Sequence, residues 1–113
     1  MNTASDIAGK YAEEIAHARM EMARGDYLEG FAHLERAHIL GQRNTVRHTY
    51  AHWLMLCAGL RRRDFTEVLG QAPRILASIL FSRIWVPRGN TGRARVSAMK
   101  PMPLPGDLRH LDL

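Results

Sequence analysis

The sequence predicts an all-α fold of two antiparallel helical hairpins, four to five helices in total, with an extended Pro-rich C-terminal arm. Two observations carry this prediction. Apolar residues recur every three to four positions through most of the first part of the chain, and Pro101, Pro103 and Pro105 enforce extended backbone near its end. A chain of 113 residues supports one hydrophobic core. We therefore expect a single domain, residues 1–113, with a helical core over about 5–85 and the arm over about 86–113.

The first hairpin is predicted from two apolar stripes separated by a turn. Ser5 is a good N-cap for a first helix, which Gly25-Asp26 ends. The stripe of this helix consists of Ile7, Tyr11, Ile15, Ala18 and Met22. A second helix over about Tyr27 to Leu40 ends at Gly41, a residue that readily adopts the left-handed conformation. Its apolar side carries Tyr27, Phe31, Leu34 and His38.

The second hairpin begins with a third helix over about Thr45 to Leu60. The cluster Arg61-Arg62-Arg63 suits the negative end of the dipole of this helix. Its predicted apolar stripe consists of Val46, Tyr50, Trp53, Cys57 and Leu60.

Asp64 and Glu67 form an N-cap pair for a fourth helix. Pro73 cannot continue a helix comfortably, so we expect a kink or a new start there and then helix to about Ile84. The apolar run from Ile75 to Val86 is interrupted by Arg83 and is too short to cross a membrane, so it is interpreted as a buried helix.

The two turns resemble one another. Arg24-Gly25-Asp26-Tyr27 and Arg62-Arg63-Asp64-Phe65 each join two helices, and their Asp residues are 38 positions apart. This spacing is near the period of tetratricopeptide and related repeats, in which one hairpin buries its apolar side against the next. The pattern changes after Trp85, where Gly89-Asn90-Thr91-Gly92 indicates turns and the arm begins.

Composition indicates a cytoplasmic protein. The single Cys57 cannot form an intramolecular disulfide, and the first thirty residues carry six acidic side chains rather than an apolar secretory core. We expect no membrane-spanning segment.

Charge is distributed unevenly. The net charge is +5, and no acidic residue occurs between Val68 and Gly106, where Arg74, Arg83, Arg88, Arg93, Arg95 and Lys100 are found. Such a region is able to attract an anionic partner. Nucleic acid is disfavoured because the region lacks aromatic platforms and nucleic-acid-binding motifs.

Four of the six histidines lie between positions 33 and 52. On a helix, His48 and His52 lie about 40° apart around the axis, which suits two ligands of one metal ion. Glu35 and His38 form a Glu-x-x-His pair on the preceding helix. A mononuclear site of His38, His48 and His52 with Glu35 or His33 would suit Zn²⁺ or Cu²⁺, and Met55 would shift the preference toward Cu⁺.

Two other interpretations of these side chains were considered. A di-iron site needs carboxylates from further helices, and the third helix contains none. His38 is also in line with Phe31 and Leu34, a position typical of a buried neutral histidine with one hydrogen bond. The sequence leaves the choice between metal ligand and polar packing open.

Several segments together resemble the bacterial domain of unknown function 3703 family. They are HLERAHILGQR, HTYAHWLML, RRRDFTEVLGQ and WVPRGNTG with VSAMKPMPLPGDL, and the resemblance spans Phe31 to Leu108. Matching positions include His33, Glu35, His38, His48, His52 and Met55, the Asn90-Thr91-Gly92 turn and the Pro101 to Pro105 tail. The first helix matches less closely. The resemblance implies membership but no activity.

The sequence is compatible with three functions. The first is a non-enzymatic interaction module, because no P-loop, dinucleotide fingerprint or other catalytic constellation is present. Its partner would be an unknown protein, or a second copy of the chain that covers residues 75–86. The second is a Zn- or Cu-binding protein, and the third is a binder of an anionic partner through the basic half.

Overall fold

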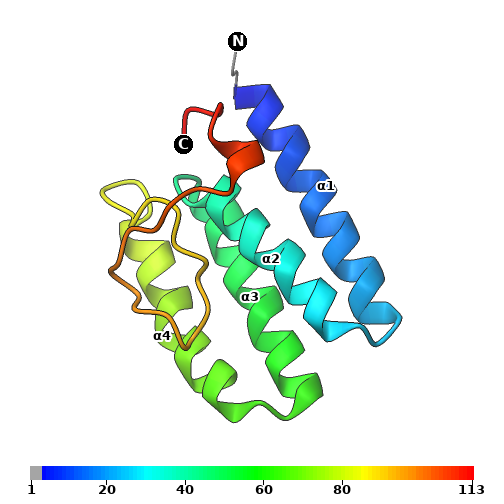
Figure 1. The fold of residues 1–113 in the computed structure, drawn as a ribbon. Helices are drawn as coiled ribbons and strands as arrows, with labels where there is room; N and C mark the ends of the chain where they lie inside the picture. The colour runs from blue at the N-terminus through cyan, green and yellow to red at the C-terminus, as the bar shows by residue number, and fades with distance from the viewer. Residues whose placement is uncertain (1–3) are drawn as a thin grey trace.

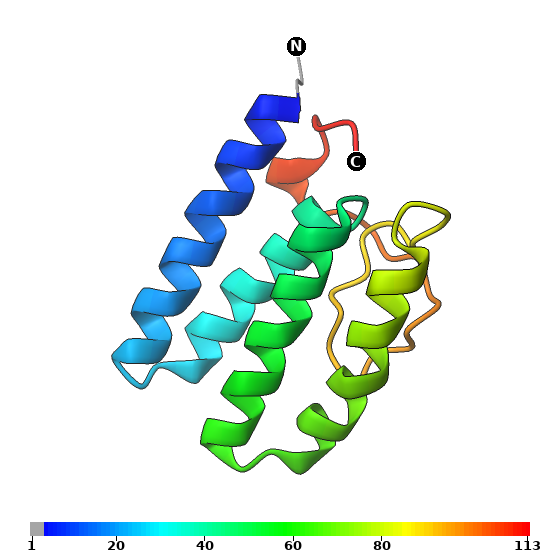
Figure 2. The ribbon, with the colours of Figure 1, turned by 180° about the vertical axis from the view of Figure 1, so that it is seen from behind.

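The computed structural model describes residues 4–113 and is all-α in this range, as predicted. It contains α1 (Ala4–Ala23), α2 (Tyr27–Gly41), α3 (Thr45–Arg62), α4 (Phe65–Phe81) and a short 3₁₀ helix, η1 (Gly106–Leu108). The helices pair as two hairpins, α1 with α2 and α3 with α4, and α2 also packs on α3 (Figure 1). Seen from behind, the four helices follow one another in chain order across the molecule (Figure 2). No helix within residues 4–113 has the length and apolar character that crossing a membrane requires.

Side-chain caps begin three of the helices. The carboxylates of Asp26 and Asp64 and the amide oxygen of Asn44 each accept a hydrogen bond from the backbone N–H three residues on, at 3.0 to 3.2 Å. The predicted N-cap of the first helix is wrong, since Ser5 already lies inside α1, which includes Ala4.

The core consists of two apolar clusters. One is formed where α1 and α2 meet the end of the arm, and its buried members are Tyr11, Ala37, Ile39, Leu40, Leu104, Leu108 and Leu111. The other lies where α1, α2 and α3 meet, and its buried members are Ala18, Phe31, Leu34, Met55 and Ala58. The predicted stripes of α1 and α2 therefore face the core.

The predicted apolar stripe of α3 is wrong. Val46, Trp53 and Leu60 are 78, 51 and 51% exposed, whereas the opposite face is buried. The buried residues of α3 are His48, Ala51, His52, Met55, Ala58 and Gly59. The Ala and Gly residues of this face allow close approach to the flanking helices, and the histidines have hydrogen-bond partners, so this face can be buried at little cost.

The prediction of a buried run at residues 75–86 is also wrong. Leu76, Ile79 and Leu80 are more than half exposed, and the buried residues of α4 are Glu67, Gln71 and Ser78. Nor does Pro73 start a new helix, since α4 is continuous through it. Proline has no N–H to donate to the backbone carbonyl group one helical turn earlier. Because Pro73 is exposed, water can hydrogen-bond to that carbonyl group instead. Helix α4 ends at Phe81, three residues before the predicted end.

The arm is not extended throughout, because it contains several hydrogen-bonded turns as well as η1, and it is fixed by polar contacts. The Asn90 amide nitrogen donates to the carbonyl oxygens of Ser97 and Lys100 at 2.7 and 2.8 Å, and Arg36 pairs with Asp107. Figures 1 and 2 show the arm running beside α4 and returning to the start of α1. The predicted arm therefore packs along both hairpins.

Candidate metal centre

Three buried histidines from two helices meet at one point. His38 belongs to α2, and His48 and His52 lie one turn apart on α3. Their side chains are 2, 7 and 3% exposed. Each Nε2 atom lies 3.1 Å from each of the other two, so the three atoms form an equilateral triangle. We call these residues the histidine triad.

The tautomer of His38 follows from its partner. Its Nδ1 lies 2.7 Å from the backbone oxygen of Asn90, which can only accept a hydrogen bond. Nδ1 therefore carries the proton, and Nε2 carries a lone pair.

The tautomer of His52 is set by a buried chain of polar groups. The amide nitrogen of Gln71 donates to a carboxylate oxygen of Glu67 at 2.6 Å and to the backbone oxygen of Gly92 at 2.8 Å. This orientation leaves the amide oxygen of Gln71 facing Nδ1 of His52 at 2.5 Å. Because this oxygen can only accept, Nδ1 of His52 is protonated and Nε2 is not.

The tautomer of His48 follows in the same way. Its Nδ1 lies 2.8 Å from the hydroxyl oxygen of Ser82. The single proton of that hydroxyl is donated to the carbonyl oxygen of Ser78, so the oxygen accepts from Nδ1 of His48. All three Nε2 atoms thus turn lone pairs toward one another, with no proton available to join them.

The imidazoles of the triad do not become protonated near neutral pH, so the repulsion between the three lone pairs is not removed in that way. Burial, reinforced by the neighbouring histidines, lowers the pKa of His38 well below its ordinary value. Burial and His52 lower the pKa of His48 to about 3. Burial lowers the pKa of His52 to about 4 against the opposing effect of its bond to Gln71. The triad is therefore neutral at pH 7, and its converging lone pairs are the arrangement that a metal cation stabilises.

The triangle has the dimensions of a facial three-nitrogen site. The corners of an equilateral triangle with 3.1 Å sides lie about 1.8 Å from its centre, and Zn–N bonds are about 2.0 to 2.1 Å. An ion could therefore be held at that bond length by the Nε2 atoms of His38, His48 and His52 together. Three protein ligands would leave room in its coordination sphere for a further ligand.

A cavity of about 380 Å³ opens beside the triad. The three histidines form part of its wall, and apolar side chains form much of the rest, including Phe81, Ile84, Trp85, Val86 and Met99. A metal ion on the triad would thus face space for a further ligand.

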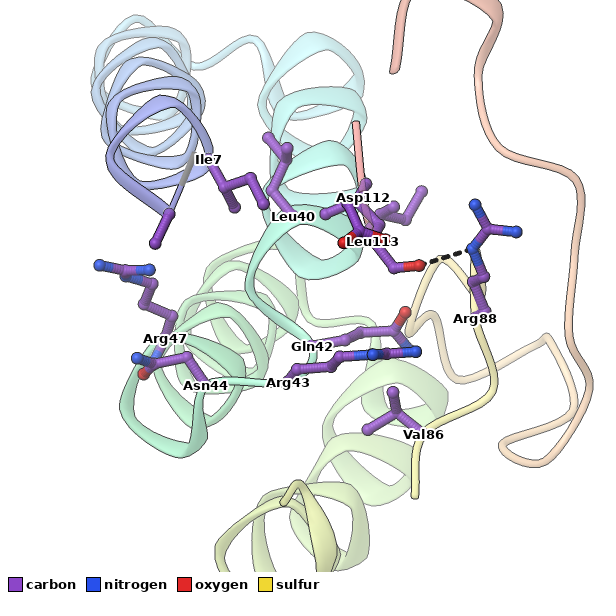
Figure 3. A pocket seen from close by; sticks show the side chains of 12 residues that line it. Ile7, Leu40, Gln42, Arg43, Asn44, Arg47, Val86, Arg88, Asp112 and Leu113 are labelled. Atoms are coloured by element: carbon purple, nitrogen blue, oxygen red, sulfur yellow. Dashed lines mark hydrogen bonds between the residues drawn. The ribbon is translucent and has the colours of Figure 1, made fainter. Parts of the chain in front are cut away.

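A second cavity, of about 200 Å³, lies between the start of α1, the α2–α3 turn and the C-terminus, and contains no histidine (Figure 3). In Figure 3 its wall carries Arg43, Arg47 and Arg88, and Arg88 Nε donates to the backbone oxygen of Leu113 at 2.7 Å. Of these two cavities, the first is the one that the histidines line.

Comparison with known proteins places the chain in a family. The model of the family described as "Protein of unknown function (DUF3703)" matches residues 5–111. The chain belongs to the DUF3703 family. No curated protein and no solved structure matches it. The match also covers α1, where the sequence resembled the family less closely.

The structure of this DUF3703 member brings together three of the five residues considered as ligands. His38, His48 and His52 form a group of potential ligand atoms within 4.8 Å of one another, and this group contains neither Glu35 nor His33. A carboxylate oxygen of Glu35 lies 3.8 Å from Nη1 of Arg93, and Nδ1 of His33 lies 3.0 Å from a carboxylate oxygen of Glu14.

Met55 is a core residue and not a ligand of the histidine triad. Its sulfur lies 3.3 Å from the Gln71 amide nitrogen, and its side chain is buried in the apolar cluster between α1, α2 and α3. The structure therefore gives no reason to favour Cu⁺.

The residues that orient the triad were missed in the sequence. They are Gln71, Ser82, Asn90 and, behind Gln71, Glu67. Asn90 is 52 positions from His38, too far for any local pattern to connect them. A signal did exist in α4, where Glu67, Gln71, Ser78 and Ser82 share one helical face inside an apolar segment.

Proposed function

We propose that this protein binds one transition-metal ion, preferentially Zn²⁺, through the Nε2 atoms of His38, His48 and His52. The observation that carries the proposal is the convergence of three unprotonated nitrogens at 3.1 Å in a buried position. If these histidines served only as polar packing, one Nε2 atom would carry a proton and donate it in a hydrogen bond to another. Here every Nδ1 hydrogen points outward to a fixed acceptor, as in metal-bound histidines.

The donor set favours zinc among the metals predicted from the sequence. Neutral imidazoles suit Zn²⁺ and also Cu²⁺, whereas Cu⁺ prefers sulfur ligands. The thioether of Met55 contacts Gln71 instead of contributing a ligand, and Met99 lines the cavity without belonging to the group of converging ligand atoms. A zinc ion held by three histidines keeps one coordination position open. This is the ligand pattern of catalytic zinc sites, whereas structural zinc sites have four protein ligands. We infer a centre that takes up an exogenous ligand.

Metal content is the direct test of this proposal. Untagged protein purified without chelator is analysed for bound metals, and the chelated protein is then titrated with Zn²⁺. We expect about one equivalent of metal in the parent and its loss in His52→Gln. The matched controls His33→Gln and Glu35→Gln change residues outside the triad and retain the metal. Absence of high-affinity Zn²⁺ or Cu²⁺ binding by folded parent protein contradicts the proposal.

A second function, compatible with the first, is that of an interaction module. We infer it from the exposed apolar face of α4, which a helix in an isolated domain would bury. The assignment of the two hairpins to a tetratricopeptide-like arrangement belongs to this same proposal, since such repeats present helical surfaces to partners.

Binding of an anionic partner through the basic half receives less support. Arg93 pairs with Glu67, and Arg95 pairs with Asp64. Arg74 and Arg88 donate to backbone oxygens. Four of the six cations in the acid-free segment are thus engaged within the protein.

A further inference from the structure

The cavity beside the histidine triad combines an apolar wall with an excess of positive charge. The histidines are neutral, Arg74 is the charged residue of its wall, and no Asp or Glu lines it. Nη1 and Nη2 of Arg74 donate to the backbone oxygens of Gly70 and Val96, both at 2.8 Å. Nε is buried and has no acceptor among the described residues. Among the described residues the guanidinium forms no ion pair with a carboxylate. Burial lowers the pKa of Arg74, the nearby carboxylate of Glu67 raises it, and that carboxylate is itself paired with Arg93.

A metal ion on the triad would add to this charge. The three imidazoles are neutral ligands, so a divalent ion would retain its two positive charges beside Arg74. Uncompensated charge in an apolar surrounding is costly, and an anion bound to the metal would offset it. The wall formed by Phe81, Ile84, Trp85 and Met99 would favour an apolar group on the same molecule.

We propose that the open position of this metal centre takes an amphiphilic anion, a small monocarboxylate with an apolar tail. The carboxylate binds the metal and faces the charge of Arg74, and the tail lies in the 380 Å³ cavity. This inference rests on the proposed metal function. It deepens that function by naming the ligand class.

The Co²⁺-loaded protein tests the ligand class, because the visible absorption of Co²⁺ changes when a ligand enters its coordination sphere. Acetate, octanoate and 1-octanol are the probes. We expect both acids to change the spectrum and octanoate to bind at least tenfold more tightly than acetate, since each buried methylene contributes about a fourfold factor. The alcohol, which has the tail but no charge, should bind at least tenfold more weakly than octanoate.

Two variants separate the two parts of the ligand. Arg74→Met should weaken both acids about tenfold or more, as expected for loss of a charged partner, while the control Arg61→Gln, at an exposed position on α3, leaves them unchanged. Trp85→Ala should reduce the preference for octanoate over acetate. If Co²⁺ does not bind, the metal function itself fails. If Co²⁺ binds but no acid changes its spectrum, or acetate and octanoate bind equally, the ligand class is wrong.

A separate observation concerns the outer face of α4. Five large apolar residues, Phe65, Leu69, Leu76, Ile79 and Leu80, fall within an arc of about 100° around this helix, and they are 54 to 75% exposed. The opposite face carries Glu67, Gln71 and Ser78, all buried. The burial of α4 is therefore the reverse of that of an ordinary amphipathic helix. Its polar face is buried and supplies the network that orients His52, whereas its apolar face is exposed.

The size of this face approaches that of an interface. Taking about 200 Å² for each large side chain, the exposed fractions give on the order of 600 Å² of apolar surface. That is the upper end of patches on monomers. Two such faces would bury about 1,200 Å² together, which is the lower end for specific interfaces.

We infer that this face of α4 pairs with the same face of a second copy of the chain. The five residues carry no charge, so the face can meet itself without like-charge repulsion. A helix that lies on a membrane surface usually places cations along its polar side. Here that side faces the protein, and its cation, Arg74, donates to the backbone oxygens of Gly70 and Val96, which favours a second copy over a lipid surface.

Molar mass in solution tests this pairing. Light scattering on the eluting parent protein at about 50 μM should give twice the chain mass of 12.8 kDa. Leu76→Asp should give the monomer mass with unchanged helical circular dichroism. The control Leu28→Asp changes a residue that is 80% exposed on α2 and should leave the dimer intact. A monomeric parent protein overturns the inference, and binding of that monomer to anionic vesicles would instead indicate a lipid partner. A Leu76→Asp variant that stays dimeric also overturns it.

Discussion

Gly92 lies directly against the imidazole of His38. A Cβ atom built on Gly92 would be 2.5 Å from Cδ2 and 2.7 Å from Nε2 of that ring, and Gly92 has a positive φ of 80°. The arm thus holds His38 from two sides, since the backbone oxygen of Asn90 accepts from its Nδ1. The arm is part of the candidate metal centre and not merely a cover for the helices.

The first prediction concerns this contact. Gly92→Ala should displace His38 and weaken Zn²⁺ binding at least tenfold, because the added methyl group overlaps the ring. The matched control is Gly25→Ala, which has a similar φ of 83° but no atom within 4 Å of its Cβ. Both variants should lose about 1 kcal/mol from backbone strain. Zinc titration and urea unfolding measure the two effects, and equal zinc affinity in the two variants would contradict the prediction.

The second prediction concerns the acceptor of His52. Gln71→Met removes the oxygen that fixes the His52 tautomer, so Zn²⁺ affinity should fall about 10- to 100-fold. Gln42 offers a control because it is also buried and donates to the backbone oxygen of Pro87. Gln42→Met should lose comparable stability, about 1 to 3 kcal/mol, but retain zinc affinity. Equal zinc affinity in both variants would show that Gln71 does not orient a ligand.

The comparison of sequence and structure is informative at α3 and α4. Helical spacing located these helices to within a few residues, because capping residues and turn glycines act locally. It assigned the wrong face of α3 to the core and predicted burial of residues 75–86, because both predictions relied on apolar content alone. The buried face of α3 contains His48 and His52, whose burial depends on partners that only the tertiary fold provides.

The candidate site was also predictable only in part: the sequence identified the members of the triad but did not exclude Glu35 and His33. The spacing of His48 and His52 on one helix is a local pattern and identified two members of the triad, with His38 as a third on the neighbouring helix. Glu35 and His33 were equally close in sequence, but Glu35 lies near Arg93 and His33 bonds to Glu14. Which members of a cluster converge depends on the rotation of α2 against its neighbours, and helical spacing alone does not fix this rotation.

The third prediction is a pH dependence of the metal-free protein. The pKa of His48 is about 3 and that of His52 about 4 in the folded state, against about 6.5 in the unfolded chain. Between these values the unfolded state binds more protons, so stability falls as the pH is lowered from about 6.5 toward 4 and is insensitive to these groups above 7. Urea midpoints measured from pH 8 to pH 4.5 test this slope.

A variant separates the triad from the acidic groups that also titrate in this range. His48→Gln removes one of the shifted histidines, so its urea midpoint should fall less steeply between pH 6.5 and 5 than that of the parent. A parent whose stability is flat over this interval would show that the histidines are not held neutral by the fold.

The last prediction concerns the ion pair behind the triad. Glu67 is fully buried, and its carboxylate accepts from Nε of Arg93 at 2.6 Å, from the backbone N–H of Ala94 at 3.0 Å and from Gln71. The Arg93 guanidinium also lies 3.9 Å above the ring of Phe31. Arg93→Met removes the only cation paired with this carboxylate among the described ion pairs. We expect a loss of about 3 to 5 kcal/mol, because a buried charge is left without its partner.

A double-mutant cycle distinguishes that cause from lost packing on Phe31. Glu67→Gln removes the charge but retains an amide that can bond to Gln71, so the double variant Arg93→Met/Glu67→Gln should be more stable than Arg93→Met alone. Urea unfolding of the four proteins gives a coupling energy of at least about 1 kcal/mol if the charges interact. Additive losses would assign the role of Arg93 to its contact with the aromatic ring, and the carboxylate would then depend on Ala94 and Gln71 for its burial.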